Sequence, residues 1–214
     1  PFYRLRSAWF IMREYLEAQD IPYLEGTISG GVTTNYTPPP PRVSEIQVRL
    51  VSVNDIAPLV KQFIFSPLNG QKLPTARAGS HIKVVVDEKH TRHYSITNPE
   101  DSHTYQIAVK RDDQGKGGSI LMHELEVGVV LTVGSPNNFF PIRKSPGRAI
   151  LIAGGIGFTP ILSMARALAK SNERDFEAHV CVRKAADAPL NLIKEGEACS
   201  SYINFYRDDA TSGG

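Results

Sequence analysis

The chain has 214 residues, of which 41% are hydrophobic and 21% charged, and its formal net charge is +2. This composition is typical of an ordinary soluble globular protein with one or two domains. Because the net charge is small and no apolar run approaches the roughly 20 residues of a membrane span, neither nucleic-acid binding nor a membrane location is indicated.

The chain contains two cysteines, Cys181 and Cys199. Neither belongs to a CxxC pair, which excludes a zinc site or a four-thiolate iron–sulfur cluster built from this chain alone. A disulfide between them is possible but not favoured, because Cys181 lies in an apolar, strand-like run where a buried free thiol is the usual outcome. Residues 1–13 do not read as a signal peptide. We therefore expect no metal site and a reducing, cytoplasmic compartment.

The first 41 residues combine a helical pattern with a proline-rich run. A short amphipathic helix is expected, because apolar residues recur at helical spacing, at Leu5, Trp9, Met12 and Leu16. The four prolines of Pro38–Pro41 cannot join a helix or a central strand and favour an extended spacer. We interpret residues 1–41 as a helical segment and a linker, the tail of a preceding domain.

Residues 42–146 consist of short alternating runs separated by turn residues, as expected of a small antiparallel barrel. Six strands are predicted, at Ser44–Val53, Val60–Phe65, His81–Val86, His93–Thr97, Tyr105–Lys110 and Val129–Val133. One short helix fits at Ser119–Leu125, with Ser119 as its N-cap. The sequence therefore predicts a six-stranded Greek-key β-barrel with one short helix.

Residues 147–214 alternate between strand and helix. Three strands are predicted at Arg148–Ala153, Phe176–Val182 and Tyr202–Tyr206, with helices between them at Pro160–Lys170 and Leu190–Glu197. This alternation indicates a parallel sheet, of which only half of a doubly wound domain is present. We predict an incomplete α/β nucleotide-binding domain. Since an exposed half-sheet would leave an unpaired edge, we also expect the chain to be a fragment of a longer polypeptide.

The run Arg92-His93-Tyr94-Ser95 lies on one of the predicted barrel strands. Tyr94 and Ser95 would point to opposite faces of that strand. The Ser95 hydroxyl could reach the edge of a planar ring such as a flavin, and the Arg92 guanidinium suits a phosphate. Taken alone, the run also fits a barrel strand with a surface arginine.

A second run, Gly115-Lys116-Gly117-Gly118-Ser119, opens the predicted short helix. Adjacent glycines let backbone N–H groups approach an oxygen closely, and the start of a helix carries partial positive charge. The run therefore predicts a phosphate cradle, although a flexible hairpin with a helix cap is equally compatible with it.

The third run, Gly154-Gly155-Ile156-Gly157, directly follows a predicted strand and precedes a helix. This is the context of a dinucleotide motif, but the glycine order differs from GxGxxG. Thr159 could cap the helix, and Pro160 suits its first turn. A tight turn without a ligand is the alternative.

Together, the three runs resemble the RxYS, GxGGS and GGxGxTP motifs of the ferredoxin–NADP reductase superfamily. Within it, the chain is similar to the phthalate dioxygenase reductase type, which includes the vanillate demethylase reductases. Further matches are Ala78–Ile82, Ile107–Lys110 and Pro136–Phe139. The resemblance extends from about Val43 to Tyr206.

The resemblance implies roles for individual residues. The cofactor-binding set would be Arg92, His93, Tyr94, Ser95, Ile96, Ala108, Val109, Lys110, Gly117, Gly118, Ser119, Gly154, Gly155, Gly157, Thr159, Pro160 and Arg183. In this set, the residues up to Ser119 would hold the flavin ring and its phosphate, and the glycines from Gly154 onward the nucleotide pyrophosphate. Ser95 and Thr159 would lie nearest the reacting rings and are the expected catalytic residues. Arg183 would contact the adenosine half of the nucleotide.

The resemblance also implies the cofactors. The GGS run is similar to that of the FMN-binding branch, whereas FAD-binding relatives carry a longer loop, so FMN is favoured over FAD. The strand ends in Cys181-Val182-Arg183 and lacks the serine that accompanies arginine in many NADPH-selective members. NADH is therefore favoured, although Arg183 and Lys184 could meet a 2′-phosphate.

By this resemblance the chain is an enzyme, a flavin-dependent NAD(P)H oxidoreductase module. It would pass hydride from NADH to FMN and then single electrons to an iron–sulfur or haem acceptor. The acceptor would be a [2Fe-2S] ferredoxin domain, a Rieske oxygenase or a cytochrome P450, in trans or in missing parts of the polypeptide. Two alternatives stay open: an FAD-dependent ferredoxin-reductase-like enzyme, and a truncated flavin-binding docking module without NAD(P)H activity.

Overall fold

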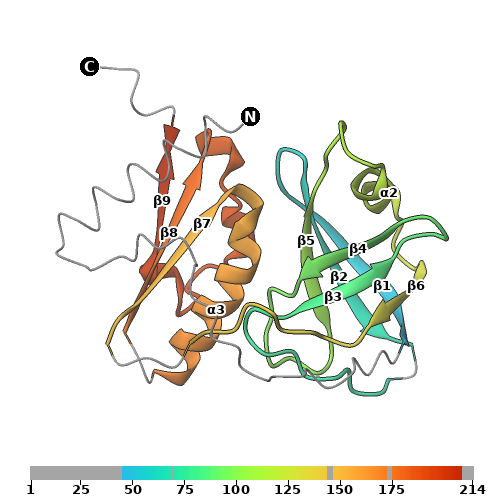
Figure 1. Cartoon of the computed structure of the whole chain (residues 1–214), viewed down its shortest axis with the longest axis horizontal. Helices are drawn as coiled ribbons and strands as arrows, with labels where there is room; N and C mark the ends of the chain where they lie inside the picture. Colours follow the sequence, from blue (N-terminus) through green and yellow to red (C-terminus); the bar gives the residue numbers. More distant parts are fainter. Residues whose placement is uncertain (1–44, 69, 144–146, 173–174, 209–214) are drawn as a thin grey trace, which may run out of the picture. The chain divides into compact units, whose positions relative to one another are not determined.

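The computed structural model describes residues 45–208, apart from residues 69, 144–146 and 173–174 (Figure 1). The helix and the proline-rich linker expected within residues 1–41 lie outside this described part. All described residues belong to one compact unit, Val43–Gly214. None of the helices in the described part is both long enough and apolar enough to cross a membrane.

Six antiparallel strands form the first sheet, in the order β4-β3-β6-β1-β2-β5. They are β1 (Glu45–Ala57), β2 (Val60–Pro67), β3 (His81–Val85), β4 (Thr91–Ser95), β5 (Tyr105–Lys110) and β6 (Val130–Gly134). Beyond the end of β4, Ile96 forms an isolated antiparallel bridge with Ile107, and the Thr97 N–H donates to Gln106 O at 2.8 Å. The outer strands β4 and β5 therefore approach each other at this bridge. The six predicted strands are confirmed.

A bulge in β1 changes which face of the strand is apolar. Before the bulge, Val48 and Leu50 are fully buried in the core of the six-stranded sheet. The pairing with β2 shifts register between Leu50 and Ser52, and again between Asp55 and Ala57 at Ile56, and such shifts change the face to which the following side chains point. Ile56 consequently packs with the α/β region, so β1 contributes to two apolar clusters.

The short helix α2 (Gly118–Glu124) follows a glycine turn and contacts β5. Its N-cap is Gly117, whose backbone is left-handed at φ 82°, a conformation that glycine adopts readily. Ser119 lies inside the helix, and its hydroxyl accepts a hydrogen bond from the Asp112 N–H at 3.0 Å. The prediction that Ser119 is the N-cap was wrong, because its hydroxyl is hydrogen-bonded to the loop before the helix and not to the N–H groups of the first helical turn.

The second sheet is parallel, in the order β7-β8-β9, and α3 lies against β7 and β8 (Figure 1). Its elements are β7 (Ala149–Gly154), the 3-10 turn η1 (Gly155–Gly157), α3 (Phe158–Ser171), β8 (Phe176–Val182), the 3-10 turns η2 (Ala185–Asp187), η3 (Leu190–Leu192) and η4 (Ser200–Tyr202), and β9 (Ile203–Arg207). The helix α3 ends where Asn172 adopts left-handed backbone at φ 50° and its N–H returns to Leu168 O. The predicted parallel sheet is confirmed.

The helix predicted at Leu190–Glu197 was wrong, because only the short turn η3 forms there. In an α-helix the Leu192 carbonyl would accept the N–H of Gly196. Here Arg166 Nη2 donates to that carbonyl at 2.8 Å, and Gly196 is in left-handed backbone at φ 71°. A hydrogen bond from α3 therefore replaces the helix. Both cysteines are free, as the sequence favours.

The two sheets share one apolar cluster. Three side chains of the six-stranded sheet pack with α3 and the parallel sheet: Ile56 of β1, Val60 of β2 and Ala108 of β5. Ile107 and Val109, the neighbours of Ala108, are buried in the core of the six-stranded sheet. Alternate side chains of a strand point to opposite faces, so β5 buries both of its faces at this position.

Candidate functional site

Arg92 and the glycine turn before α2 form a polar corner beside β4. Arg92 Nη1 donates to Thr91 O at 2.9 Å, and its Nη2 donates to Lys116 O at 3.3 Å. The guanidinium lies so close to Gly118 that a Cβ there would meet Arg92 Nε at 2.6 Å. Glycine therefore permits this approach and leaves the backbone of the turn bare beside a permanent cation. The fold brings the first two sequence runs together.

The Tyr94 hydroxyl is buried and has no hydrogen-bond partner in the described part of the chain. Tyr94 follows Arg92 by two residues, so both side chains lie on the same face of β4. Burial raises the pKa of Tyr94 to about 12, although the Arg92 charge acts in the opposite direction. The hydroxyl is therefore protonated at neutral pH. Because an unpartnered buried donor is costly, its place beside Arg92 fits an acceptor supplied by a ligand, such as the phosphate of a flavin.

Ser95 and His93 lie on the opposite face of β4. Ser95 pairs with His81 of β3 and is half-buried. The His81 ring is centred 5.3 Å from that of His93 and 5.4 Å from that of the exposed Phe139. Burial lowers the pKa of His81 and the neighbouring His93 lowers it further, so the His81 imidazole is neutral at pH 7. The face that carries Ser95 thus has a neutral imidazole and an exposed phenyl ring beside it.

The other residues predicted to line a flavin differ in what they can offer. The side chains of Ile96 and Val109 are buried in the core of the six-stranded sheet, and the Ile96 N–H donates to Ser80 O at 2.9 Å. Contact of these two residues with a ligand is therefore limited to backbone atoms. Ala108 faces the α/β region, and Lys110 is exposed at the end of β5.

The glycine run between β7 and α3 lies against β5. Gly155 is in left-handed backbone, at φ 52°, which explains the glycine at that position. Gly154 and Gly157 have no atom within 4 Å of the place where a Cβ would stand, so the space beside the turn is open. The turn predicted to hold a nucleotide and the strand predicted to line a flavin are therefore neighbours in the fold.

Thr159 and Pro160 occupy the first turn of α3. Thr159 was expected to cap the helix, but the helix begins at Phe158, so this prediction was wrong. The Thr159 hydroxyl donates to Ile156 O at 3.1 Å, which holds the glycine turn in shape. Pro160 suits this position because its missing N–H would have no partner within the helix.

Arg183 follows the last residue of β8 and is exposed. Gly154 pairs with Cys181 across β7 and β8, so the glycine turn and Arg183 lie at the same carboxyl edge of the parallel sheet. Ligands of open parallel α/β sheets bind at this edge. The residues predicted to contact the pyrophosphate and the adenosine half therefore share one edge.

The residues that make polar contacts between the two sheets were not among the predicted site residues. The Gly79 N–H lies 3.4 Å from Ser163 Oγ of α3, and a Cβ on Gly79 would stand 2.1 Å from Phe140 O. Arg166 of α3 donates to Thr97 O at 2.8 Å. Gly79 lies in a run that resembles the family, which is a usable signal. Arg166 has no such signal, because its partners are far away in the chain.

No protein-family model matches the chain. Vanillate O-demethylase oxidoreductase of Pseudomonas putida is 41% identical over 166 residues, which are 77% of this chain and 52% of the relative. The carnitine monooxygenase reductase subunit of Acinetobacter pittii (strain PHEA-2) is 39% identical over 140 residues, 64% of this chain and 46% of the relative. The chain spans about half the length of these curated relatives.

The solved structure of phthalate dioxygenase reductase, described as a modular structure for electron transfer from pyridine nucleotides to [2Fe-2S], is similar in fold. The TM-score is 0.72 at 31% identity, over 78% of this chain and 53% of that chain. The chain therefore belongs to the ferredoxin–NADP reductase superfamily. Within that superfamily it groups with the phthalate dioxygenase and vanillate demethylase reductases, as its motifs predict.

Proposed function

We propose that this chain is part of a flavin-dependent NAD(P)H oxidoreductase, which moves electrons from a nicotinamide nucleotide through a flavin to the acceptor of an oxygenase system. The observation that carries the proposal is the contact between β5 and the Gly155–Gly157 turn. This contact puts the strand expected to line a flavin beside the turn expected to hold a dinucleotide. The three relatives named above are reductases or oxidoreductases, which supports the same activity.

The phosphate of the flavin is proposed to bind at the corner formed by Arg92, Tyr94, Gly117 and Gly118. Arg92 supplies a permanent charge, Tyr94 an available donor and the bare turn its backbone N–H groups. We assign the positive charge to Arg92 and not to the dipole of α2, because that helix has only seven residues. This donor set suits a terminal phosphate, which FMN carries, so we favour FMN over FAD.

A bound flavin would supply the chemistry, which is acceptance of a hydride from nicotinamide and release of electrons one at a time. The residues of this chain bind and orient the two partners. Ser95 is proposed to donate a hydrogen bond to the ring from the face of β4 opposite Tyr94. Thr159 keeps the glycine turn in shape through Ile156 O. Ala108 and its apolar neighbours exclude water from the junction of the sheets.

We propose NADH as the electron donor, with NADPH as the alternative. Arg183, exposed at the carboxyl end of β8, is proposed to contact the adenosine half of either nucleotide. The proposed acceptor is a [2Fe-2S] ferredoxin domain, because phthalate dioxygenase reductase is described as transferring electrons from pyridine nucleotides to [2Fe-2S]. A Rieske oxygenase and a cytochrome P450 are the other acceptors of this class.

The test uses the complete polypeptide that contains this chain, purified with its own cofactor. Mass spectrometry of the extracted cofactor separates FMN from FAD. Under anaerobic conditions, NADH should bleach the flavin absorbance at about 450 nm, and NADPH should do so more slowly. A bound flavin that neither nucleotide bleaches would contradict the proposal and favour a docking module.

The phosphate corner has its own matched pair of variants. Arg92→Ala should weaken flavin binding by about tenfold or more, because charge-assisted hydrogen bonds contribute about 1.5–3 kcal/mol. Arg49→Ala is the control, since Arg49 is also a strand arginine that donates to a backbone carbonyl, Gly128 O at 3.0 Å. Equal flavin affinity in the two variants, measured by fluorescence titration, would exclude the corner as the phosphate site.

A further inference from the structure

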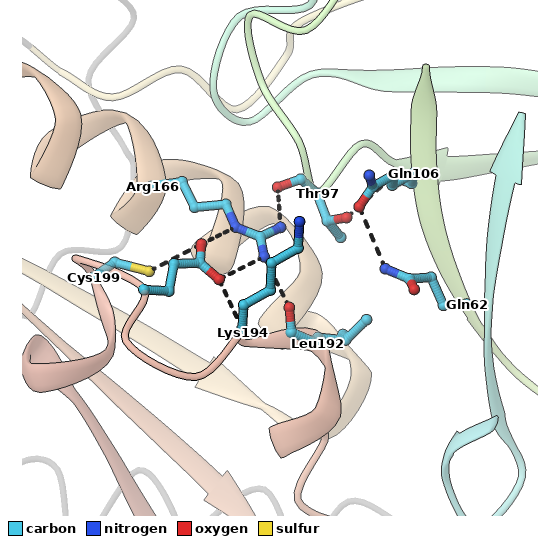
Figure 2. A network of polar contacts seen from close by, with 8 residues as sticks. Gln62, Thr97, Gln106, Arg166, Leu192, Lys194 and Cys199 are labelled. Atoms are coloured by element: carbon cyan, nitrogen blue, oxygen red, sulfur yellow. Dashed lines mark hydrogen bonds and ion pairs between the residues drawn. The ribbon is translucent and has the colours of Figure 1, made fainter. Parts of the chain in front are cut away.

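Arg166 of α3 binds three residues at once, Thr97 in one part of the chain and Leu192 and Glu197 in another (Figure 2). Its Nη1 donates to Thr97 O at 2.8 Å, and its Nη2 donates to Leu192 O at 2.8 Å. Its Nε and Nη2 donate to the two carboxylate oxygens of Glu197, at 2.5 and 3.0 Å. These contacts use all but one of the N–H donors of the guanidinium. We call Arg166 and Glu197 the Arg166 clasp.

Glu197 is itself fixed within the chain. The Lys194 N–H donates to its Oε2 at 2.9 Å, and the Cys199 thiol donates to its Oε1 at 3.5 Å. The side chains of Arg166 and Glu197 are only 15% and 19% exposed. Burial alone would raise the pKa of Glu197, but the hydrogen bonds from Arg166 and Lys194 outweigh it and hold that pKa below its usual value. The carboxylate is therefore charged at neutral pH and keeps the arginine in one orientation.

Thr97 connects the clasp to the strands of the proposed flavin site. It lies two residues after Ser95 and is fully buried. Its N–H donates to Gln106 O of β5 at 2.8 Å, two residues before Ala108. Arg166 thus holds a carbonyl at the place where β4 and β5 approach each other.

The other end of the connection is the glycine turn. The helix α3 begins directly after the Gly155–Gly157 turn and is 14 residues long, so fixing Arg166 also fixes the turn. The helix α3 makes two other polar contacts with loops that connect strands of the six-stranded sheet, and both are weaker. The Gly79 N–H lies 3.4 Å from Ser163 Oγ, and the ion pair between Lys170 and Glu100 is exposed to solvent.

We infer that Arg166, held by Glu197, is a positioning residue for hydride transfer, because it sets the distance between the glycine turn and the ends of β4 and β5. The inference rests on the proposed function. Arg166 is not among the residues expected to touch either ligand and acts through Thr97 and α3. Lysine at this position would keep the charge but could not bind Glu197 and two carbonyls at once, because it lacks the planar fork of donors.

The test compares Arg166→Lys with Lys170→Met in the complete polypeptide carrying its flavin. Lys170 is a matched control because it lies on the same helix and its loss removes only the exposed ion pair. In anaerobic stopped-flow experiments, Arg166→Lys should slow flavin reduction by NADH about 100-fold, a loss that a displacement of about 1 Å can cause. The charge-transfer absorbance between nicotinamide and flavin should weaken, while flavin affinity stays that of the wild type. Lys170→Met should change none of these.

Hydrogen exchange of the cofactor-free protein gives a second readout. Backbone N–H groups of residues 190–199 should exchange faster in Arg166→Lys, and at the wild-type rate in Lys170→Met, because the clasp holds that segment. If Arg166→Lys does not fold, the double substitution Arg166→Met with Glu197→Gln takes its place, since it leaves no buried charge unpaired.

The outcomes separate this inference from the proposed function. Wild-type reduction rates in Arg166→Lys, together with faster exchange, would overturn the positioning role and leave the proposed function intact. Slow reduction without faster exchange would also overturn it, because the effect would not pass through the clasp. If neither nucleotide reduces the wild-type protein, the proposed function fails and this inference fails with it.

Discussion

Two arginines of this chain, Arg92 and Arg166, occupy contrasting environments. Arg166 donates to a carboxylate and to two carbonyls that are all fixed by the fold. Arg92 donates to two carbonyls, one of them at 3.3 Å, beside a Tyr94 hydroxyl without a partner in the described residues. The hydrogen bonding distinguishes a junction whose polar groups are matched within the chain from a corner where the Tyr94 hydroxyl has no acceptor among the described residues, which is where we propose that the flavin phosphate binds.

The largest expected effect is on the junction. Arg166→Met alone should lower the free energy of unfolding by about 3–5 kcal/mol, because it leaves a buried carboxylate without its partner. Adding Glu197→Gln should recover most of that loss, since the uncompensated charge is then removed. Urea unfolding of the two variants measures this. Equal losses in the single and double variants would mean that packing, and not charge, makes Arg166 important.

At the phosphate corner we expect a loss of binding without a loss of stability. In Gly118→Ala the new Cβ would displace the Arg92 guanidinium and weaken flavin binding by about tenfold, the loss of one charge-assisted hydrogen bond. Stability should hold or rise by up to about 1 kcal/mol, because alanine favours a helix over glycine. Flavin fluorescence titration and thermal unfolding report the two quantities. A parallel fall in both would make the corner a structural feature.

A smaller effect is expected for the Tyr94 hydroxyl. Tyr94→Phe removes a donor that has no partner among the described residues, so the stability of the cofactor-free protein should not fall. Flavin affinity should drop by about fivefold, the value of one net hydrogen bond of about 1 kcal/mol. The same fluorescence titration measures it. Unchanged affinity would show that the hydroxyl does not face the ligand.

The smallest effect concerns pH. Glu197 has a lowered pKa in the folded protein, so the clasp contributes stability that is complete above the usual glutamate value of 4.5. That contribution is lost as the pH falls below this value and through the lowered pKa. Glu197→Gln should therefore flatten the decline of unfolding free energy below about pH 5. Identical pH slopes for the variant and the wild type would contradict the lowered pKa.

The sequence pattern predicted correctly those strands and helices that depend mainly on residues close together in the chain. The strand at Phe176–Val182 and the six strands of the antiparallel sheet follow from alternation and turn residues. The helix predicted at Leu190–Glu197 failed because Arg166 takes the Leu192 carbonyl. No window of sequence around residue 192 contains that donor, so a tertiary contact overrode the local preference.

In the candidate site, too, the sequence predicted individual residues but not the contacts between distant parts of the chain. The motifs pointed to Arg92 and Gly118 separately, and the fold places the guanidinium against the glycine. The predictions that Ser119 and Thr159 cap their helices were both wrong. The Ser119 hydroxyl accepts a hydrogen bond from the Asp112 N–H in the preceding loop, and the Thr159 hydroxyl donates to Ile156 O in the glycine turn. Arg166 could not be found from the sequence, since Thr97 is 69 residues away from it.

The register shift in β1 has a consequence for how the molecule can be divided. The strand enters one apolar cluster through Leu50 and the other through Ile56, and Val60 and Ala108 extend the second cluster onto the six-stranded sheet. A cut near residue 147 that separated the two sheets would expose the side chains of Ile56, Val60 and Ala108 to water. The two halves should therefore melt in one cooperative transition, and chimaeras should exchange them together.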